Sequence, residues 1–331
     1  MRSAQAQFAG CPDLLLLVVD PDESREPLPA CSVLSVRPFA ATDGVFELPE
    51  PLPVRSDTLG RVGLAEHHAA WRRAATRVEV RGGFATLDDR IPHSFEHNAL
   101  RLRSPGPVEE VLTDAARVFG AAGRAHWRIA IDHPCGAPLA SDLATRGWEV
   151  TAYRLLAWSP DTDRARPEVS EGPFARELSR VEAEDLVHSA WLEGSLQLTD
   201  EQLRQLVVRD RLDQAWVLPF GIGVVDRGGR TMAGLRLEID GGCAEITSVL
   251  TLEAARRRGL AGASIREALR RALEHGCDRV WLTADADDWV ADYYVRLGFV
   301  DLNWTTWSAQ RPVLDSPSSQ ARSAGSCRDR V

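Results

Sequence analysis

The chain has 331 residues and a formal net charge of −9, and its 44% hydrophobic and 26% charged residues are ordinary for a globular protein with a sizeable core. The acidic balance, with a pI near 5.5, argues against broad nucleic-acid binding, which needs a basic face. The six cysteines are scattered without a C-x-x-C pair, so they indicate neither a zinc site nor a disulfide-stapled fold, and we expect no metal.

Residues 1–60 show no regular pattern. The apolar run Leu14–Val19 is too short to span a bilayer, which needs about 20 residues, and several prolines interrupt residues 27–53. The residues before Cys11 contain no apolar segment of the kind found in signal peptides. We therefore expect a cytoplasmic protein that binds no membrane.

From about Leu64 the pattern becomes regular, and we expect a first folded unit at residues 61–160. Residues 65–83 open like a helix, whereas residues 97–104 and 127–132 resemble strands. Between these strands, apolar residues recur at helical spacing and predict one buried face, which consists of Val108, Val111, Leu112, Ala115, Ala116 and Phe119.

A charged, proline-containing segment at residues 161–173 is typical of a linker, and a second unit follows at residues 169–313. The small, polar end of the chain, residues 314–331, predicts a disordered tail. The strand-like stretches Trp127–Ile131 and Asp278–Leu282 are each followed, at the same interval, by a glycine and an aromatic residue, Gly147-Trp148 and Gly298-Phe299. This pattern favours an internal duplication.

Three consecutive arginines, Arg256–Arg258, stand before Gly259. Upstream, residues 244–251 alternate as a strand does, with one predicted face made by Glu245, Thr247, Val249 and Thr251. Downstream, a helical face is followed by Gly276, which suits a left-handed helix end; that face consists of Ile265, Ala268, Leu269, Ala272 and Leu273. The stretch is therefore a strand-to-helix turn.

Such a turn leaves backbone N–H groups unpaired at the positive end of a helix dipole, and small residues let an anion approach them. A phosphate site is one interpretation, and a solvated surface turn is the other. A Walker loop is excluded because the chain has no lysine, and the spacing of Gly259, Ala261 and Gly262 does not fit a dinucleotide-binding fingerprint.

The stretch resembles the signature of the GNAT family, the Gcn5-related N-acetyltransferases, R/Q-x-x-G-x-G/A, here Arg256-x-x-Gly259-x-Ala261. It departs from the wider family pattern at Glu253, Ala254 and Arg257, where proline, glutamate and glycine are usual. A second family landmark, N-x-x-A-x-x-L-Y-x-x-L-G-F, is similar to residues 288–299, which have one position fewer between the alanine and the tyrosine. There Asp288 replaces the asparagine, Tyr293 stands where leucine is common, and Tyr294 occupies the tyrosine position.

The resemblance implies an α/β fold with a mixed, mostly antiparallel sheet, helices on both faces and a V-shaped gap between two parallel strands that binds acetyl-CoA. It implies a tandem of two GNAT-like units, of which the first is degenerate. The residues that it assigns to the cofactor are Val249, Leu250, Thr251, Arg256, Arg257, Arg258, Gly259, Leu260, Ala261, Gly262 and Asp288.

In this family reading, an amine attacks the thioester directly, and Tyr294 donates a proton to the leaving thiolate. Glu245 is our candidate base. Two alternatives without a catalytic or binding role stay open: Asp288 caps the following helix, and Tyr294 only packs in the core. The function implied is acetyl-CoA-dependent transfer to a primary amine, and the alternative is an acyl-CoA sensor without chemistry.

The acceptor is expected to be a small molecule or a peptide amine rather than a nucleic acid. A helix pair near Asp185–Leu203 would roof its site, and the acids of this pair favour a cationic acceptor. The protein is expected to be a monomer or a homodimer.

Overall fold

The structure is a computed structural model that describes residues 62, 70, 75–160, 173–193, 199–213, 218–240 and 242–311. The predictions for residues 1–60, for residues 161–172 of the linker and for the tail at 314–331 lie outside this part of the chain. We call residues 75–160 the N-terminal half and residues 173–311 the C-terminal half.

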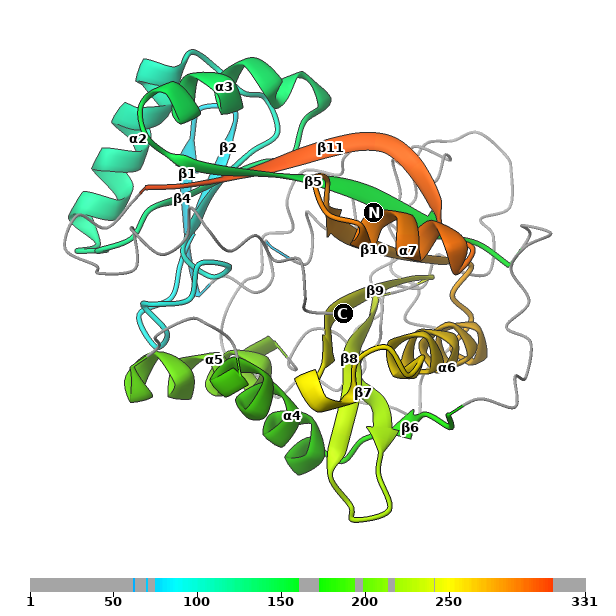
Figure 1. The fold of residues 1–331 in the computed structure, drawn as a ribbon. Helices are drawn as coiled ribbons and strands as arrows, with labels where there is room; N and C mark the ends of the chain where they lie inside the picture. Colours follow the sequence, from blue (N-terminus) through cyan, green and yellow to red (C-terminus); the bar gives the residue numbers. More distant parts are fainter. Residues whose placement is uncertain are drawn as a thin grey trace, which may run out of the picture.

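The described strands form one 11-stranded sheet in the order β1-β2-β3-β4-β11-β5-β10-β9-β8-β7-β6 (Figure 1). The N-terminal half supplies β1 (Thr76–Val80), β2 (Gly83–Leu87), β3 (Ala99–Leu102), β4 (Arg128–Ile131) and β5 (Glu149–Trp158). The C-terminal half supplies β6 (Arg176–Glu177), β7 (Leu218–Val225), β8 (Thr231–Asp240), β9 (Cys243–Thr251), β10 (Arg279–Asp285) and β11 (Val300–Gln310). Neighbouring strands are antiparallel except for β3 with β4 and β9 with β10, which confirms the predicted mixed sheet.

The two halves exchange strands at the centre of this sheet. β5 of the N-terminal half lies between β11 and β10, and β11 of the C-terminal half lies between β4 and β5. Trp158 of β5 is buried in the core of the C-terminal half, and Ala309 of β11 is buried in the core of the N-terminal half. The predicted units at 61–160 and 169–313 therefore share one sheet, and each core is completed by a strand from the other half.

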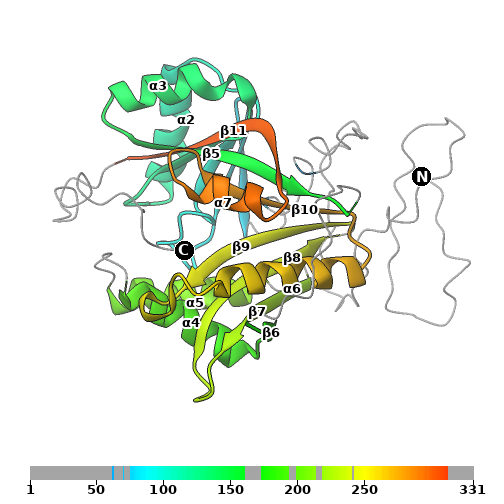
Figure 2. The same ribbon diagram turned by 45° about the vertical axis from the view of Figure 1, so that its right-hand side comes forward.

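Helices cover both faces of the sheet, as predicted. They are α2 (Val108–Ala121), α3 (Ala137–Thr145), α4 (Arg180–Glu193), α5 (Asp200–Asp213), α6 (Leu260–Glu274) and α7 (Val290–Arg296), with short 3₁₀ turns η2 (Pro134–Gly136) and η3 (Glu253–Ala255). Figure 2 shows α6 on one side of β7–β9, with α4 and α5 on the other. The glycines of β7 and β8 let α4 approach closely, because a Cβ on Gly234 would lie 2.8 Å from Leu186 Cδ2.

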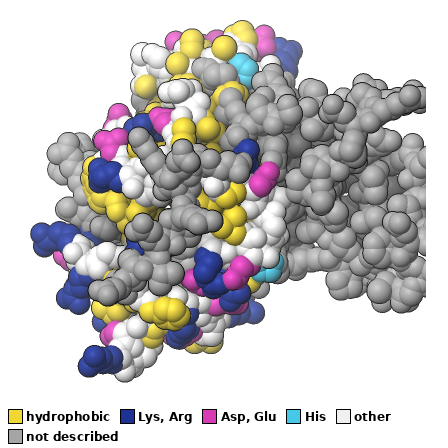
Figure 3. All heavy atoms as spheres, turned by 90° about the vertical axis from the view of Figure 1, so that its right-hand side faces the viewer, with side chains coloured by type: hydrophobic (Ala, Val, Ile, Leu, Met, Phe, Trp, Pro, Cys, Tyr) yellow, Lys and Arg dark blue, Asp and Glu magenta, His cyan; other side chains and the backbone are white. Residues whose placement is uncertain are grey.

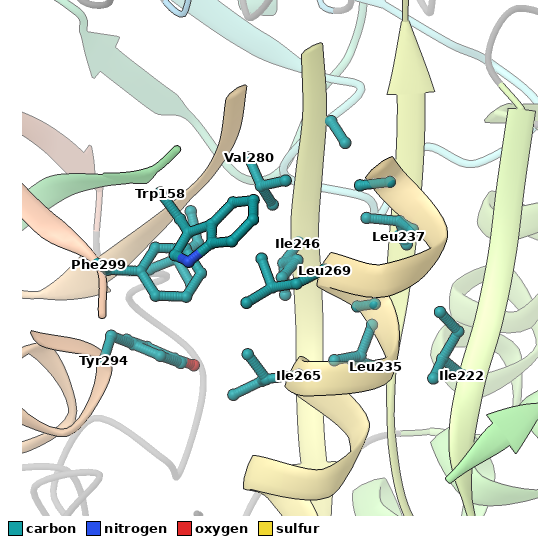
Figure 4. Packing of buried hydrophobic residues seen from close by; sticks show 14 of the residues in the cluster. Trp158, Ile222, Leu235, Leu237, Ile246, Ile265, Leu269, Val280, Tyr294 and Phe299 are labelled. Atoms are coloured by element: carbon teal, nitrogen blue, oxygen red, sulfur yellow. The ribbon is translucent and has the colours of Figure 1, made fainter. Parts of the chain in front are cut away.

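The core of the C-terminal half is built from apolar side chains of α6 and the inner strands (Figure 4). Ile265 and Leu269 of α6 pack against Ile246 of β9 and the neighbouring strands. Trp158 lies next to Phe299 at the edge of this core and is only 1% exposed. A Trp of this size, if truncated to alanine in a packed core, costs about 3–5 kcal/mol, so β5 contributes strongly to the stability of the C-terminal half.

The predicted buried faces of α2 and α6 are mostly correct, and each contains one residue that is exposed in the structure. α2 buries Val118, which the sequence prediction omitted, whereas Ala116 is exposed. The centre of the buried stripe lies between Val111, Ala115 and Val118, and Ala116 falls just outside it. α6 buries its predicted face except for Leu273, which is 37% exposed near the helix end, where Gly276 adopts the predicted left-handed conformation.

The order of elements in the N-terminal half, β3-α2-β4-α3-β5, matches β9-α6-β10-α7-β11 in the C-terminal half. Gly147 and Gly298 occupy equivalent places, since they follow α3 and α7, the second helix of each repeated order, and each has a positive φ, of 80° and 98°. These conformations suit glycine, which has no Cβ to clash with the backbone. The matched order is the structural counterpart of the repeated sequence landmarks.

Basic and acidic side chains both occur on the described part of the face that Figure 3 shows. Arg270 pairs with Glu267 and Glu274 on the same helix, and Arg271 pairs with Glu177 at 2.7 Å. Exposed pairs of this kind contribute little to stability. They do neutralise these two arginines, which lie beyond the first turn of the helix.

His126, in the N-terminal half, predicts a pH dependence of folding. Its ring lies 4.3 Å from that of Phe95, its Nε2 has no hydrogen-bond partner, and burial, reinforced by the charges of His93 and Arg124, lowers its pKa from 6.5 to about 4. The unfolded chain therefore binds more protons between these values. We expect the free energy of unfolding to be highest above pH 6.5, where His126 is neutral in both states. It should fall by up to about 3 kcal/mol as the pH drops toward 4.

Chemical denaturation of the wild type and of His126→Leu at a series of pH values measures this effect. The leucine variant cannot titrate at this position, so its stability should fall less between pH 6.5 and 4. Parallel pH profiles for the two proteins would contradict the assignment.

Candidate active site

The parallel strands β9 and β10 separate after a short common segment. They pair at Cys243–Glu245 with Arg279–Trp281, and no further pairing between them is present. Beyond this point β9 continues to Thr251 beside β8, and β10 continues to Asp285 beside β5. The two strands therefore form the predicted V-shaped gap, with an edge of β9 that is left without a strand partner.

A β-bulge changes the course of β9 along this gap. Ser248 has a φ of 52°, and the register with β8 shifts there by one residue. Because a one-residue shift exchanges the faces of a strand, Val249 packs into the core together with Ile246. The predicted face that joined Glu245 and Thr247 with Val249 and Thr251 is therefore wrong beyond Ser248.

The turn from β9 to α6 presents free amides and uncompensated positive charge. No N–H group of residues 257–262 donates a hydrogen bond to another described residue. The first turn of α6 has no acidic side chain, and Arg256–Arg258 form no ion pair within the described part of the chain. Gly259, the N-cap, has a φ of 75°, with no atom near the place of a Cβ. This arrangement favours an anion, because free amides and the helix dipole point at the same spot.

Arg257 is strained in this turn. Its φ is 61°, in the left-handed region that costs a residue with a Cβ roughly 1–2 kcal/mol. This is the position where the family pattern has glycine. We expect Arg257→Gly to raise the free energy of unfolding by about 0.5–1 kcal/mol, after the added flexibility of the unfolded chain is subtracted. Thermal melting measures the change. Arg258→Gly is the control, since Arg258 has an ordinary φ, and equal shifts in the two variants would contradict the strain argument.

Helix α7 brings two adjacent tyrosines to the gap. Tyr294 is 5% exposed, its ring packs against Phe299, and burial raises the pKa of its hydroxyl. In Figure 4 this hydroxyl points from α7 toward Ile265 of α6, across the gap. Tyr293 is half-buried, with its ring 5.7 Å from that of Tyr294 and its hydroxyl 3.2 Å from where a Cβ of Gly262 would lie. Tyr294 is thus the more deeply buried tyrosine of the pair, which agrees with the core-packing alternative, and its role as the acid stays a prediction.

Asp288 does not cap α7. The N-cap of this helix is Trp289, and no side chain caps it through a hydrogen bond, so the capping alternative for Asp288 is wrong. The Oδ1 atom of Asp288 is buried and has no hydrogen-bond partner. A buried acceptor without a donor is costly, and it suits a ligand that brings an N–H group.

The comparisons with known proteins identify the domain that contains these features. The model of the acetyltransferase (GNAT) family matches residues 182–299. Residues 182–299 form a GNAT domain. A GCN5-related N-acetyltransferase from Kribbella flavida has a similar structure, with a TM-score of 0.55 at 22% identity over 78% of this chain and 97% of that one. A functionally unknown conserved protein from Staphylococcus epidermidis gives a TM-score of 0.56 at 15% identity, over 71% of this chain and 93% of that one. No curated protein sequence matches the chain.

Within the GNAT domain, Glu245 stands where the gap opens. It is half-buried, it is opposite Trp281 in the last β9–β10 pair, and on its other side it is opposite Glu238 of β8. Glu238 is 4% exposed and pairs with Arg236 at 2.9 Å. The predicted base, Glu245, therefore lies beside the carboxylate of Glu238, which forms an ion pair with Arg236.

The equivalent place in the N-terminal half is closed. There the parallel strands β3 and β4 pair along their whole common length, up to Leu102 and Ile131. The following helix starts after Pro107, which has no N–H group, and carries Glu109 and Glu110 in its first turn. Because these acids repel anions, this half lacks the unpaired amides and the acid-free first helical turn that favour an anion in the GNAT domain.

Three features of the site were not predicted from the sequence. They are the bulge at Ser248, the contact of Tyr293 with the first turn of α6, and the edge of β10 that is covered by β5. Only Tyr293 gave a signal, as a departure from the leucine of the family pattern. Among the described residues, no group of three His, Cys, Asp or Glu side chains could hold a metal ion, and no helix is long and apolar enough to cross a membrane.

Proposed function

We propose that the protein is an N-acetyltransferase that moves an acetyl group from acetyl-CoA to a primary amine. The observation that supports this best is the open gap between β9 and β10, which ends at the unpaired amides of residues 257–262. A diphosphate suits these amides and the neighbouring arginines, and an extended pantetheine arm suits the free edge of β9 at Val249–Thr251. The carboxylate of Asp288 would accept a hydrogen bond from an amide N–H of that arm.

The reaction follows from these placements. A neutral amine attacks the thioester carbonyl, a C–N bond forms, and the C–S bond breaks. The leaving thiolate takes the proton of the Tyr294 hydroxyl. The attacking nitrogen loses its proton to Glu245, directly or through a water molecule.

Burial favours the protonated form of Tyr294, because the phenolate would lie in apolar surroundings. The hydroxyl therefore carries its proton throughout the physiological pH range. The same surroundings also raise the pKa of the thiol that leaves into this gap, so burial shifts the proton donor and the proton acceptor in the same direction.

The amine is the least constrained part of the proposal. A cationic small molecule or a peptide amine suits the net negative charge of the chain. The expectation of a monomer or a homodimer stays a prediction. The closed site in the N-terminal half supports a duplication in which the first copy has lost cofactor binding.

Two measurements test the proposal. Calorimetry should detect binding of acetyl-CoA, and free thiol should appear when acetyl-CoA is mixed with the protein and a panel of primary amines. Binding without thiol release for any amine would favour the alternative, an acyl-CoA sensor. The absence of binding would overturn both functions.

A further inference from the structure

The loop of residues 88–98 in the N-terminal half binds helix α5 of the C-terminal half. The backbone N–H of His93 donates to Gln205 Oε1 at 2.9 Å, across 112 residues of sequence. Gln205 is only 7% exposed, and its Nε2 donates to Glu201 at 2.7 Å. Arg209 forms a second link, with its Nη1 3.2 Å from Glu96 Oε2. We call these two contacts the α5 latch.

The loop that holds the latch is itself rigid. The buried side chain of Asn98 accepts from the Asp88 N–H and donates to the carbonyls of Ile91 and Ser94, all at 2.9–3.0 Å. Arg124 adds a bond from its Nε to Asn98 Oδ1 at 2.9 Å. A loop with its polar groups satisfied in this way keeps one conformation, so it can fix the position of the helix that it binds.

Helix α5 in turn packs on α4, which forms one wall of a groove. This groove has a volume of about 260 Å³ and lies between α4 and strands β7–β9. Its lining includes Leu186 and Val187 of α4, and it reaches Ser248 and Leu250 at the bulge of β9. The groove therefore approaches the gap from the face opposite to α6.

The far end of α4 is tied to the turn that precedes the arginines. Glu193 Oε2 accepts a hydrogen bond from the Glu253 N–H at 2.8 Å. The helix pair is thus held at one end by the N-terminal half, through α5, and at the other end by the turn of residues 253–259. A change at the latch would shift α4 about its contact with this turn.

We propose that the N-terminal half sets the shape of the acceptor groove through the α5 latch, with Gln205 and Arg209 as positioning residues. The inference rests on the proposed function, in which the acceptor amine enters from the α4 side while acetyl-CoA lies on the α6 side. Loss of the latch loosens α5 and α4 and leaves the α6 turn in place. The acceptor KM should therefore rise while the affinity for acetyl-CoA stays the same.

The test compares Gln205→Ala and Arg209→Glu with the wild type in the full-length protein. Hydrogen–deuterium exchange should become about 10-fold faster in α5 and stay unchanged in α6, because the loss of a buried hydrogen bond makes local opening of the helix easier. With acetyl-CoA and the best amine of the panel, the acceptor KM should rise by about 5- to 10-fold, with little change in the Kd of acetyl-CoA.

Two further variants separate the latch from a general loss of stability. Arg204→Glu changes an exposed arginine of the same helix that pairs only within α5, and it should leave exchange in the rest of α5 and kinetics near wild type. Glu96→Arg combined with Arg209→Glu restores the ion pair with its charges exchanged, and it should recover slow exchange and a low acceptor KM.

The outcomes distinguish this inference from the proposed function. If acetyl-CoA binds but exchange in α5 is the same in Gln205→Ala, Arg209→Glu and the wild type, the latch is overturned. Faster exchange together with an unchanged acceptor KM overturns its role in the groove. If no amine reacts, the exchange data alone decide the latch, and the absence of acetyl-CoA binding counts against the proposed function instead.

Discussion

Tyr294→Phe is expected to lower kcat by about 100-fold or more, because the variant cannot donate a proton to the leaving thiolate. The ring stays packed against Phe299, so the melting temperature should change little. The Kd of acetyl-CoA should also stay close to wild type. Steady-state kinetics together with calorimetry measure the two effects separately.

Tyr293→Phe is the matched control. It removes a hydroxyl from the neighbouring residue, whose half-buried ring lies 5.7 Å from that of Tyr294. Its kcat should stay within a few-fold of wild type. If Tyr293→Phe loses the activity and Tyr294→Phe keeps it, the acid is the other tyrosine, and near-normal turnover in both variants would remove general-acid catalysis by either one.

Gly259→Leu is expected to abolish measurable binding of acetyl-CoA. Gly259 has a φ of 75°, and a side chain at this position meets no protein atom within 4 Å, so it would project into the space in front of the amides. It would also distort the turn, because a residue with a Cβ is strained at this φ. Both effects act on the place where the diphosphate would bind, and calorimetry measures the loss.

Gly276→Leu supplies a close control at the other end of α6. Its φ is 77°, and a Cβ there also meets nothing within 4 Å, so the backbone strain should be similar, at about 1–2 kcal/mol. The two variants should lose similar stability, but only Gly259→Leu should lose acetyl-CoA binding. If both variants bind acetyl-CoA as the wild type does, the diphosphate lies elsewhere.

Some of this site could be predicted because its conformation is local. The left-handed backbone at Gly276 and the apolar spacing of α6 depend on residues within one or two helical turns. The order and spacing of the two GNAT family landmarks then placed these segments in one site. The V-shaped gap itself was expected only from the resemblance to the GNAT family, since no periodicity in β9 or β10 shows where two strands separate.

Other features could not be predicted from the pattern of residues. Alternation in β9 gave the wrong face for Thr251, because the extra residue of the bulge cannot be recognised from the composition of the strand. The residue with the positive φ is Ser248, and serine, unlike glycine, does not indicate such a conformation in a sequence. Asp288 resembled a helix cap, but the helix starts after Trp289. The error at Ala116 has a similar cause, since the edge of a buried stripe depends on which elements pack against it.

By itself, the sequence determined the strand–turn–helix units, the arginine–glycine turn and the repeated order of elements in the two halves, because each follows from backbone preferences over a few neighbouring residues. The tertiary structure alone decided the exchange of β5 and β11, the closed state of the first gap and the α5 latch. The β5–β11 pairing and the latch depend on hydrogen bonds and packing between segments more than a hundred residues apart, and such contacts are selected by the whole fold rather than by any local pattern.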